Sequence, residues 1–262
     1  MRRRSHASAP PTEGGRNPGT TTNRADLPAA PRWRAEHTPA KIGAMQRVLE
    51  PEYMDTPEEA EGYQAMDHSA ANHSVVDRFL AIGGAQVRDL VDLGTGPGDI
   101  PILLAEQTSI PRILGIDAAA EMLKLARPKV QALGLSDRLH FGRADVKDLP
   151  FFAGSFDGVL SNTILHHIPE PLEFLREAAR ILRPGGVLLI RDLYRPASKD
   201  EAWRLVDLHA AGANDYQRTL FYNSFCAALT LAEAQQLTLD AGLRQARVAM
   251  SSDRHYTIEI AR

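Results

Sequence analysis

Short apolar runs alternate along this chain with longer segments in which apolar residues recur at helical spacing. The apolar runs predict five strands, over residues 87–93, 112–116, 139–142, 156–161 and 186–193. Helices are predicted between them over 100–107, 119–133 and 171–182, the second with a kink or an early end at Pro128. Strands that alternate with helices indicate right-handed crossovers and a parallel sheet with helices on both faces.

The pattern continues on both sides of this alternating region. Before it, a short helix is predicted over 44–49, and a longer one over 58–80 with a break at 67–72 that can serve as a hinge. After it, Thr230 and Glu233 form a capping box that begins a helix ending at Gly242. Two last strands, over 244–250 and 255–260, are expected to complete the sheet.

The first predicted strand ends in a turn with glycine at positions 94, 96 and 98. Glycines between a strand and a helix let the backbone approach a ligand closely, and the helix start offers free N–H groups. The turn therefore predicts a nucleotide-like cofactor at the carboxyl edge of the sheet. A dinucleotide-binding turn requires glycine where this chain has Asp99, so a dehydrogenase is disfavoured.

The order Asp-x-Gly-x-Gly-x-Gly from Asp92 to Gly98 resembles motif I of the class I S-adenosylmethionine (AdoMet) methyltransferases. Four further segments resemble motifs of this family in the family's order: 113–126, 143–146, 156–162 and 182–190. The resemblance implies a Rossmann-like, doubly wound and mostly parallel seven-stranded sheet with an antiparallel edge hairpin. It also implies AdoMet as the cofactor, bound by Asp92, Gly94, Gly96, Gly98, Asp117, Ala118, Met122, Asp145, Val146 and Asn162.

Each of these cofactor residues also has an ordinary structural explanation. Asp117 lies about 20 residues beyond the glycine turn, where an acid accepts hydrogen bonds from ribose hydroxyls, but Asp is also a common helix cap. The resemblance places Met122 against the adenine, Asp145 at its amino group and the Val146 N–H at a ring nitrogen. A methionine on a helix is otherwise core filler. The joint occurrence of the motifs at family spacing favours the cofactor interpretation.

Residues that contact the methyl acceptor are less well defined by the sequence. Leu165 to Pro169 resembles the small-molecule branch of the family, which includes quinone-biosynthesis and sterol-type methyltransferases. His167 is the candidate general base, with a structural role as the alternative, and His166 is expected to face the substrate cover or solvent. Asp192 either faces the acceptor or forms a salt bridge with a neighbouring arginine. The remaining substrate candidates are Tyr194, Tyr216 and Arg218, and no catalytic residue is assigned.

Composition changes most sharply near residue 40. Residues 1–40 carry repeated Pro, Gly and Thr with little apolar periodicity, and we expect a disordered tail there. Residues 41–262 are expected to form the methyltransferase domain, with 41–82 as an N-terminal helical cover and 195–228 as an insertion in the substrate cover. The first 40 residues have a net charge of +4 and the whole chain −3, which leaves −7 for residues 41–262. This acidic domain argues against a nucleic-acid partner.

Other features of composition restrict the compartment and the chemistry. One cysteine, Cys226, excludes an internal disulfide, and without Cys/His ligand clusters in the sequence no metal site is expected. No apolar stretch approaches a membrane span, and a cytoplasmic location is expected. The leading hypothesis is an AdoMet-dependent methyltransferase that acts at O, N or C of a small molecule. The alternatives are a protein or RNA methyltransferase and a catalytically inactive AdoMet-binding subunit; oligomeric state is left open.

Overall fold

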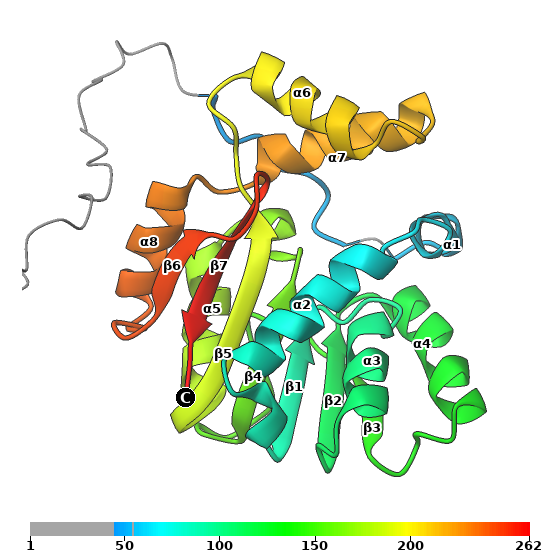
Figure 1. The fold of residues 1–262 in the computed structure, drawn as a ribbon, viewed down its shortest axis with the longest axis vertical. Helices are drawn as coiled ribbons and strands as arrows, with labels where there is room; N and C mark the ends of the chain where they lie inside the picture. Colours follow the sequence, from blue (N-terminus) through cyan, green and yellow to red (C-terminus); the bar gives the residue numbers. More distant parts are fainter. Residues whose placement is uncertain (1–44, 54) are drawn as a thin grey trace, which may run out of the picture. The chain divides into compact units, whose positions relative to one another are not determined.

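A seven-stranded sheet forms the centre of the molecule, in the order β3-β2-β1-β4-β5-β7-β6 (Figure 1). This order comes from a computed structural model that describes residues 45–53 and 55–262. Strands β1 to β5 pair in parallel, and β7 runs antiparallel to its neighbours β5 and β6. The predicted fold class is therefore confirmed. The strands are β1 (Asp89–Leu93), β2 (Arg112–Asp117), β3 (Leu139–Arg143), β4 (Phe156–Asn162), β5 (Leu182–Leu193), β6 (Arg247–Met250) and β7 (His255–Ile260).

Helices cover both faces of this sheet. Helices α2, α3 and α4 share one apolar cluster with one face, and α5 and α8 share another with the opposite face. The α-helices are α1 (Pro57–Gln64), α2 (Ser69–Ala81), α3 (Asp99–Gln107), α4 (Ala120–Ala132), α5 (Pro171–Ile181), α6 (Lys199–His209), α7 (Asp215–Ala227) and α8 (Leu231–Asp240). Two short 3-10 helices, η1 (Gly84–Gln86) and η2 (Leu165–His167), complete the described elements. Among the described residues, no helix has the length and apolar character needed to cross a membrane.

Strand β5 shows why the apolar runs in the sequence predicted the strands. Its side chains alternate between the two clusters: Val187 and Leu189 pack on the α2–α3 side, and Leu188 and Ile190 pack on the α5–α8 side. Because both faces are buried, the strand appears in the sequence as a continuous apolar run. The same two-sided burial holds for β1 and β4, whereas only Leu139 is fully buried in the edge strand β3.

The strand order reverses between β1 and β4, the two strands at the centre of the sheet. Chains that leave such neighbours pass to opposite faces, which opens a crevice at their carboxyl ends. Helices α6 and α7, from the 195–228 insertion, lie beyond this carboxyl end of the sheet (Figure 1). The segment before α1 also passes near it, because Val48 N–H donates to the Cys226 carbonyl of α7 at 3.0 Å.

The prediction of a helix over 44–49 is wrong for residues 45–49, which the structure describes. Residues 45–50 contain no helix, and Arg47 donates instead to four backbone carbonyls, those of Ala227, Pro169, His166 and Ile168. These long-range bonds hold the segment in a non-helical path. The predicted tail, residues 1–40, lies outside the described residues.

Other boundaries differ from prediction by a few residues. Helix α4 continues through Pro128 to Ala132, held by buried positions such as Met122, Ala126 and Val130. The break in the N-terminal helical region lies at 65–68, earlier than predicted, because α2 already begins at Ser69. Strand β5 begins at Leu182 and not at 186, and β6 begins at Arg247 and not at 244. The Thr230–Glu233 capping box is confirmed.

Candidate active site

The turn after β1 holds three glycines in the left-handed backbone region. The φ angles are 73° at Gly94, 54° at Gly96 and 78° at Gly98. A side chain at Gly94 would collide with Ile164, and one at Gly98 with Phe141, whereas a Cβ at Gly96 would meet no atom within 4 Å. The first and third glycines therefore permit packing, and the middle one leaves open space above the turn.

Asp117, at the end of β2, fixes this turn from the side. Its Oδ2 accepts the Gly96 N–H at 2.7 Å, and its Oδ1 accepts the Ala119 N–H at 2.8 Å. Burial raises the pKa of Asp117 above its usual value, against the lowering effect of these backbone bonds. The Ala119 bond forms a turn before α4 and is not the predicted helix cap, because Ala119 itself is the N-cap and no side chain caps it. Each carboxylate oxygen still has a lone pair for a ligand hydroxyl.

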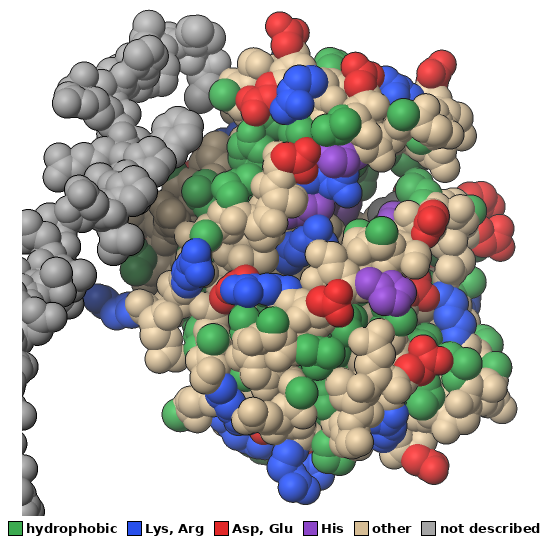
Figure 2. Space-filling model, viewed as in Figure 1, with side chains coloured by type: hydrophobic (Ala, Val, Ile, Leu, Met, Phe, Trp, Pro, Cys, Tyr) green, Lys and Arg blue, Asp and Glu red, His purple; other side chains and the backbone are tan. Residues whose placement is uncertain are grey.

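A cavity of about 960 Å³, part of it open to solvent, lies above the turn. Its wall combines residues from the carboxyl ends of β1, β2 and β4 with residues from the segment before α2. Figure 2 shows a hollow below α6 and α7, with histidine and basic side chains along its wall. The lining residues are Glu52, Tyr53, Tyr63, His68, Asn72, Gly94, Thr95, Gly96, Pro97, Asp99, Ile100, Asp117, Ala118, Ala119, Met122, Val146, Lys147, Asn162, Thr163, Ile164, His167 and Ile168.

Most of the predicted cofactor residues line this cavity. They are Gly94, Gly96, Asp117, Ala118, Met122, Val146 and Asn162. Gly98 lies just behind it, as the residue that caps α3. Asp145 is not among the lining residues. Its Oδ1 accepts the Lys147 N–H at 2.9 Å and lies 3.0 Å from the Lys147 Nζ, so its side chain pairs with Lys147.

Asp92 is placed below the cavity and not in its wall. It is 1% exposed, and its Oδ2 accepts the Thr95 hydroxyl at 2.7 Å. Burial raises the pKa of Asp92 to about 7. The structure therefore gives Asp92 a role in holding the glycine turn through Thr95, which does line the cavity.

Thr163 has a strained backbone conformation in this site. Its φ of 55° is the only positive value of a non-glycine residue in the described part of the chain. Its N–H donates to the Arg191 carbonyl at 2.8 Å, and the Asn162 side chain lies between Thr163 and the Arg191 guanidinium. Residues held in sparsely populated conformations cluster at ligand sites.

His166 is not exposed to solvent, but it faces the predicted 41–82 cover, because its ring lies within 4.8 Å of the Glu50 carboxylate. The side chain is almost completely buried, and its Nδ1 lies 2.7 Å from Asp192 Oδ1. Burial lowers the pKa of His166, but the Asp192 charge and hydrogen bond outweigh burial and hold the pKa above its usual value. The other Asp192 oxygen accepts the Leu165 N–H at 2.6 Å. Asp192 is therefore turned toward η2, and neither faces the cavity nor pairs with an arginine.

His167 lines the cavity as expected of a candidate base. Burial and the neighbouring His166 lower the pKa of His167 to about 3. A histidine with so low a pKa holds a proton weakly, which makes it a poor general base near neutral pH. Its Nδ1 lies 3.3 Å from Glu50 Oε2, without the geometry of a hydrogen bond.

The remaining substrate candidates do not reach the cavity. The Tyr194 hydroxyl donates to Glu201 Oε1 at 2.7 Å, and Arg218 pairs with Asp207 and the Ala210 carbonyl. Tyr216, on α7, is 68% exposed. The contacts of Tyr194 and Arg218 and the exposure of Tyr216 place all three side chains outside the described cavity lining.

Sequence reasoning placed the segment 45–53 in the N-terminal cover but named none of its residues as part of the site. Lys147 Nζ binds Glu52 and lies 3.2 Å from the Tyr53 hydroxyl, and all three residues line the cavity. Farther along, His68 stacks on Tyr63, and its Nε2 is buried without a hydrogen-bond partner. No local pattern marks these residues, because their contacts are with residues distant in the sequence.

Known proteins are similar to the part of the chain that forms much of this cavity. Residues 91–190 match the family model described as a methyltransferase domain. This part of the chain is similar to a methyltransferase domain. The matched range contains the glycine turn, Asp117 and the Asn162–Ile168 wall of the cavity.

Curated relatives of this domain include small-molecule methyltransferases. The 27-O-demethylrifamycin SV methyltransferase of Amycolatopsis mediterranei is 35% identical over 47% of this chain and 45% of its own. The demethylmenaquinone methyltransferase of Lactiplantibacillus plantarum is 35% identical over 41% of this chain and 46% of its own. The chain thus spans less than half the length of these relatives.

A solved structure shows the same fold over a larger part of the chain. It is described as an S-adenosyl-L-methionine-dependent methyltransferase from Methanococcus maripaludis, with a TM-score of 0.62 and 17% identity. The alignment covers 82% of this chain and 97% of that one. At this identity the likeness concerns the fold.

Proposed function

We propose that this protein transfers the methyl group of AdoMet to a small organic acceptor. The observation that carries the proposal is the cavity in which Gly96, Asp117 and the Asn162–Thr163 wall meet. AdoMet supplies a sulfonium methyl group, whose leaving group is already good, so positioning accounts for much of the catalysis.

The residues present fit this cofactor. Asp117 keeps acceptor capacity toward the cavity for ribose hydroxyls, and the missing side chain at Gly96 leaves space for a ligand close to the backbone. The buried, unpartnered His68 Nε2 offers a further polar contact from the opposite wall. Met122 and Val146 supply apolar surface for a base.

The acceptor end of the cavity is formed after β4. Ile164 and Ile168 form apolar wall there, beside Thr163 with its φ of 55°. Apolar walls exclude water from the transferring methyl group, which prevents loss of the methyl to water. The acidic domain and the small-molecule relatives support a small acceptor, whose attacking atom is left open.

Transfer of a labelled methyl group from AdoMet tests this function. The full chain is incubated with CD3-labelled AdoMet and pools of phenolic, hydroxy-acid and amine metabolites, and products are sought by mass spectrometry. We expect a labelled product from at least one pool, and much less of it with Asp117→Ala at an AdoMet concentration that is limiting for the variant. Tight AdoMet binding with no product from any pool would favour the inactive, AdoMet-binding subunit.

A further inference from the structure

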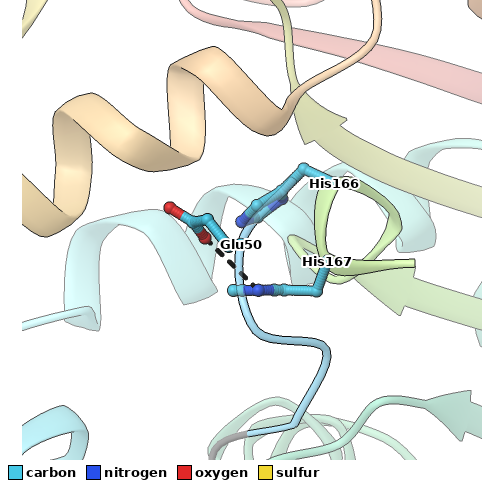
Figure 3. Close-up of side chains that lie close together, drawn as sticks. All are labelled: Glu50, His166 and His167. Atoms are coloured by element: carbon cyan, nitrogen blue, oxygen red, sulfur yellow. Dashed lines mark ion pairs between the residues drawn. The ribbon is translucent and has the colours of Figure 1, made fainter. Parts of the chain in front are cut away.

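Three side chains that can hold a metal ion meet beside the cavity. Glu50, His166 and His167 each offer one ligand atom, and these atoms all lie within 4.8 Å of one another. Figure 3 shows the Glu50 carboxylate from the segment before α1 facing the two imidazoles of η2. The cluster joins residues more than one hundred positions apart, so the sequence did not reveal it.

The His166 imidazole is oriented as histidine ligands are. Its Nδ1 is held by Asp192 at 2.7 Å, which leaves Nε2 as its available ligand atom. Metal-binding histidines almost always donate their other ring N–H to a carboxylate or carbonyl, which fixes the tautomer. Asp192 is itself held by the Leu165 and Leu193 N–H groups, so it can act as such an outer partner.

Glu50 and His167 complete the set of ligands. The Ser224 hydroxyl lies 3.1 Å from Glu50 Oε1, so this carboxylate also has an outer partner that orients it. The buried His167 Nδ1 has no hydrogen-bond partner, and it lies 3.3 Å from Glu50 Oε2. Two ligands at about 2.1 Å from a tetrahedral ion lie roughly 3.4 Å apart, close to this separation.

We propose that Glu50, His166 and His167 bind a divalent transition-metal ion at the acceptor end of the cavity. Two imidazoles and one carboxylate form a ligand set of zinc and non-haem iron sites that keep a position open for another ligand. This proposal replaces the expectation from the sequence that no metal is bound.

Charge in the surroundings is compatible with a cation. The carboxylates of Glu50 and Asp192 face the cluster, and Arg47 contributes the opposing positive charge. Arg47 directs its donors to the carbonyls of η2 and α7, away from the would-be ligands. With His166 in the neutral form that binds metals, two carboxylates and one guanidinium leave a net negative site.

The position of the ion also indicates the acceptor, and this step rests on the proposed function. Because His167 lines the cavity, an ion bound to it can hold an acceptor hydroxyl in its open position. A bound hydroxyl releases its proton to solvent more readily. The oxygen then forms the new bond to the methyl carbon, the sulfur–methyl bond breaks, and its electron pair stays on sulfur as the neutral sulfide. An oxygen acceptor is therefore the class that this site fits.

Cobalt binding tests the metal site without any acceptor. The full chain, freed of affinity tag and treated with a chelator, is titrated with Co2+ while its visible absorption is followed, and then with Zn2+ as competitor. We expect one equivalent of Co2+ to bind with d–d bands, and Zn2+ to displace it. Glu50→Gln and His167→Gln should each weaken Co2+ binding at least tenfold.

His209→Gln is the matched control. His209 also pairs with a carboxylate, Asp253 at 2.7 Å, but it lies on α6 outside the cluster, so Co2+ binding should be unchanged. Asp192→Asn should weaken Co2+ binding by 10- to 100-fold if this carboxylate orients His166.

Absence of a bound equivalent in the wild-type chain, or equal binding by Glu50→Gln, would overturn the metal site. The cluster would then be a hydrogen-bonded charge network of Glu50, His166 and Asp192. AdoMet affinity, measured on the same samples, reports separately on the proposed function. Loss of Co2+ binding in a variant that still binds AdoMet also shows that the variant is folded.

Discussion

At the scale of single residues, Gly96 and Gly98 share a left-handed backbone but differ in what an added methyl group meets. Alanine at either position costs about 1–2 kcal/mol of backbone strain. At Gly98 the methyl also lies 2.7 Å from Phe141 and 3.0 Å from Ala126, and overpacking adds about 1–3 kcal/mol. We expect Gly98→Ala to lower the free energy of unfolding more than Gly96→Ala, and Gly96→Ala to lose AdoMet affinity because its methyl enters the cavity.

Urea unfolding and calorimetry of the two glycine variants check this expectation. Equal losses of unfolding free energy, or normal AdoMet affinity in Gly96→Ala, would contradict the geometry of the turn.

Asp92 makes stability depend on pH. Its pKa of about 7 in the folded state lies above the unfolded value, so the folded chain binds the proton more tightly. The resulting stability is present below the unfolded pKa and is lost as pH rises through 7. Asp92→Asn removes this loss of stability. We therefore expect the free energy of unfolding of the variant to exceed that of the parent by an amount that grows from pH 5 to pH 8. At pH 8 the difference should be about 2–4 kcal/mol.

Comparing the free energies of unfolding of variant and parent at the same pH separates the contribution of Asp92 from that of the histidines. The pKa of His167 is lowered to about 3 and that of His255 to about 2, so both destabilise the fold as pH falls, equally in parent and variant. Urea unfolding at pH 5, 6, 7 and 8 measures the difference; a difference independent of pH would show that Asp92 is ionised throughout.

At the scale of elements, the segment 45–53 depends on one side chain. Arg47 joins it to η2 and to the end of α7 through carbonyl oxygens of both. Hydrogen bonds to a charged group contribute about 1.5–3 kcal/mol each, so Arg47→Met should cost at least about 2 kcal/mol. We expect faster amide exchange in 45–53 and 165–169, measured by mass spectrometry, with little change in α3. Unchanged exchange in 45–53 would show that other contacts hold this segment.

The elements also show what a sequence can predict. Strand β5 was predictable because burial on both faces leaves a continuous apolar run, and α8 because its capping box is local. The path of 45–53 was not, because Arg47 binds carbonyls far along the chain. The same reason hid the cluster of Glu50, His166 and His167, while Gly96 and Asp117 belong to motifs with fixed spacing.

At the scale of the whole molecule, the described residues that line the cavity all lie between Glu52 and Ile168. Residues 1–38 have few apolar side chains to bury, so their removal is expected to leave the melting temperature and AdoMet affinity unchanged. Differential scanning calorimetry of full and truncated chains measures this directly. A fall of several degrees would show that residues 1–38 pack on the domain.

Calorimetric titration of the full chain with AdoMet tests the central claim most directly. The account predicts one bound equivalent, no heat from a nicotinamide dinucleotide, and an affinity about a hundredfold lower in Asp117→Ala through the loss of ribose hydrogen bonds. Asp240→Ala, an exposed carboxylate on α8, serves as the control and should bind like the parent. Absence of AdoMet binding, or an affinity of Asp117→Ala within threefold of the parent, would contradict the account.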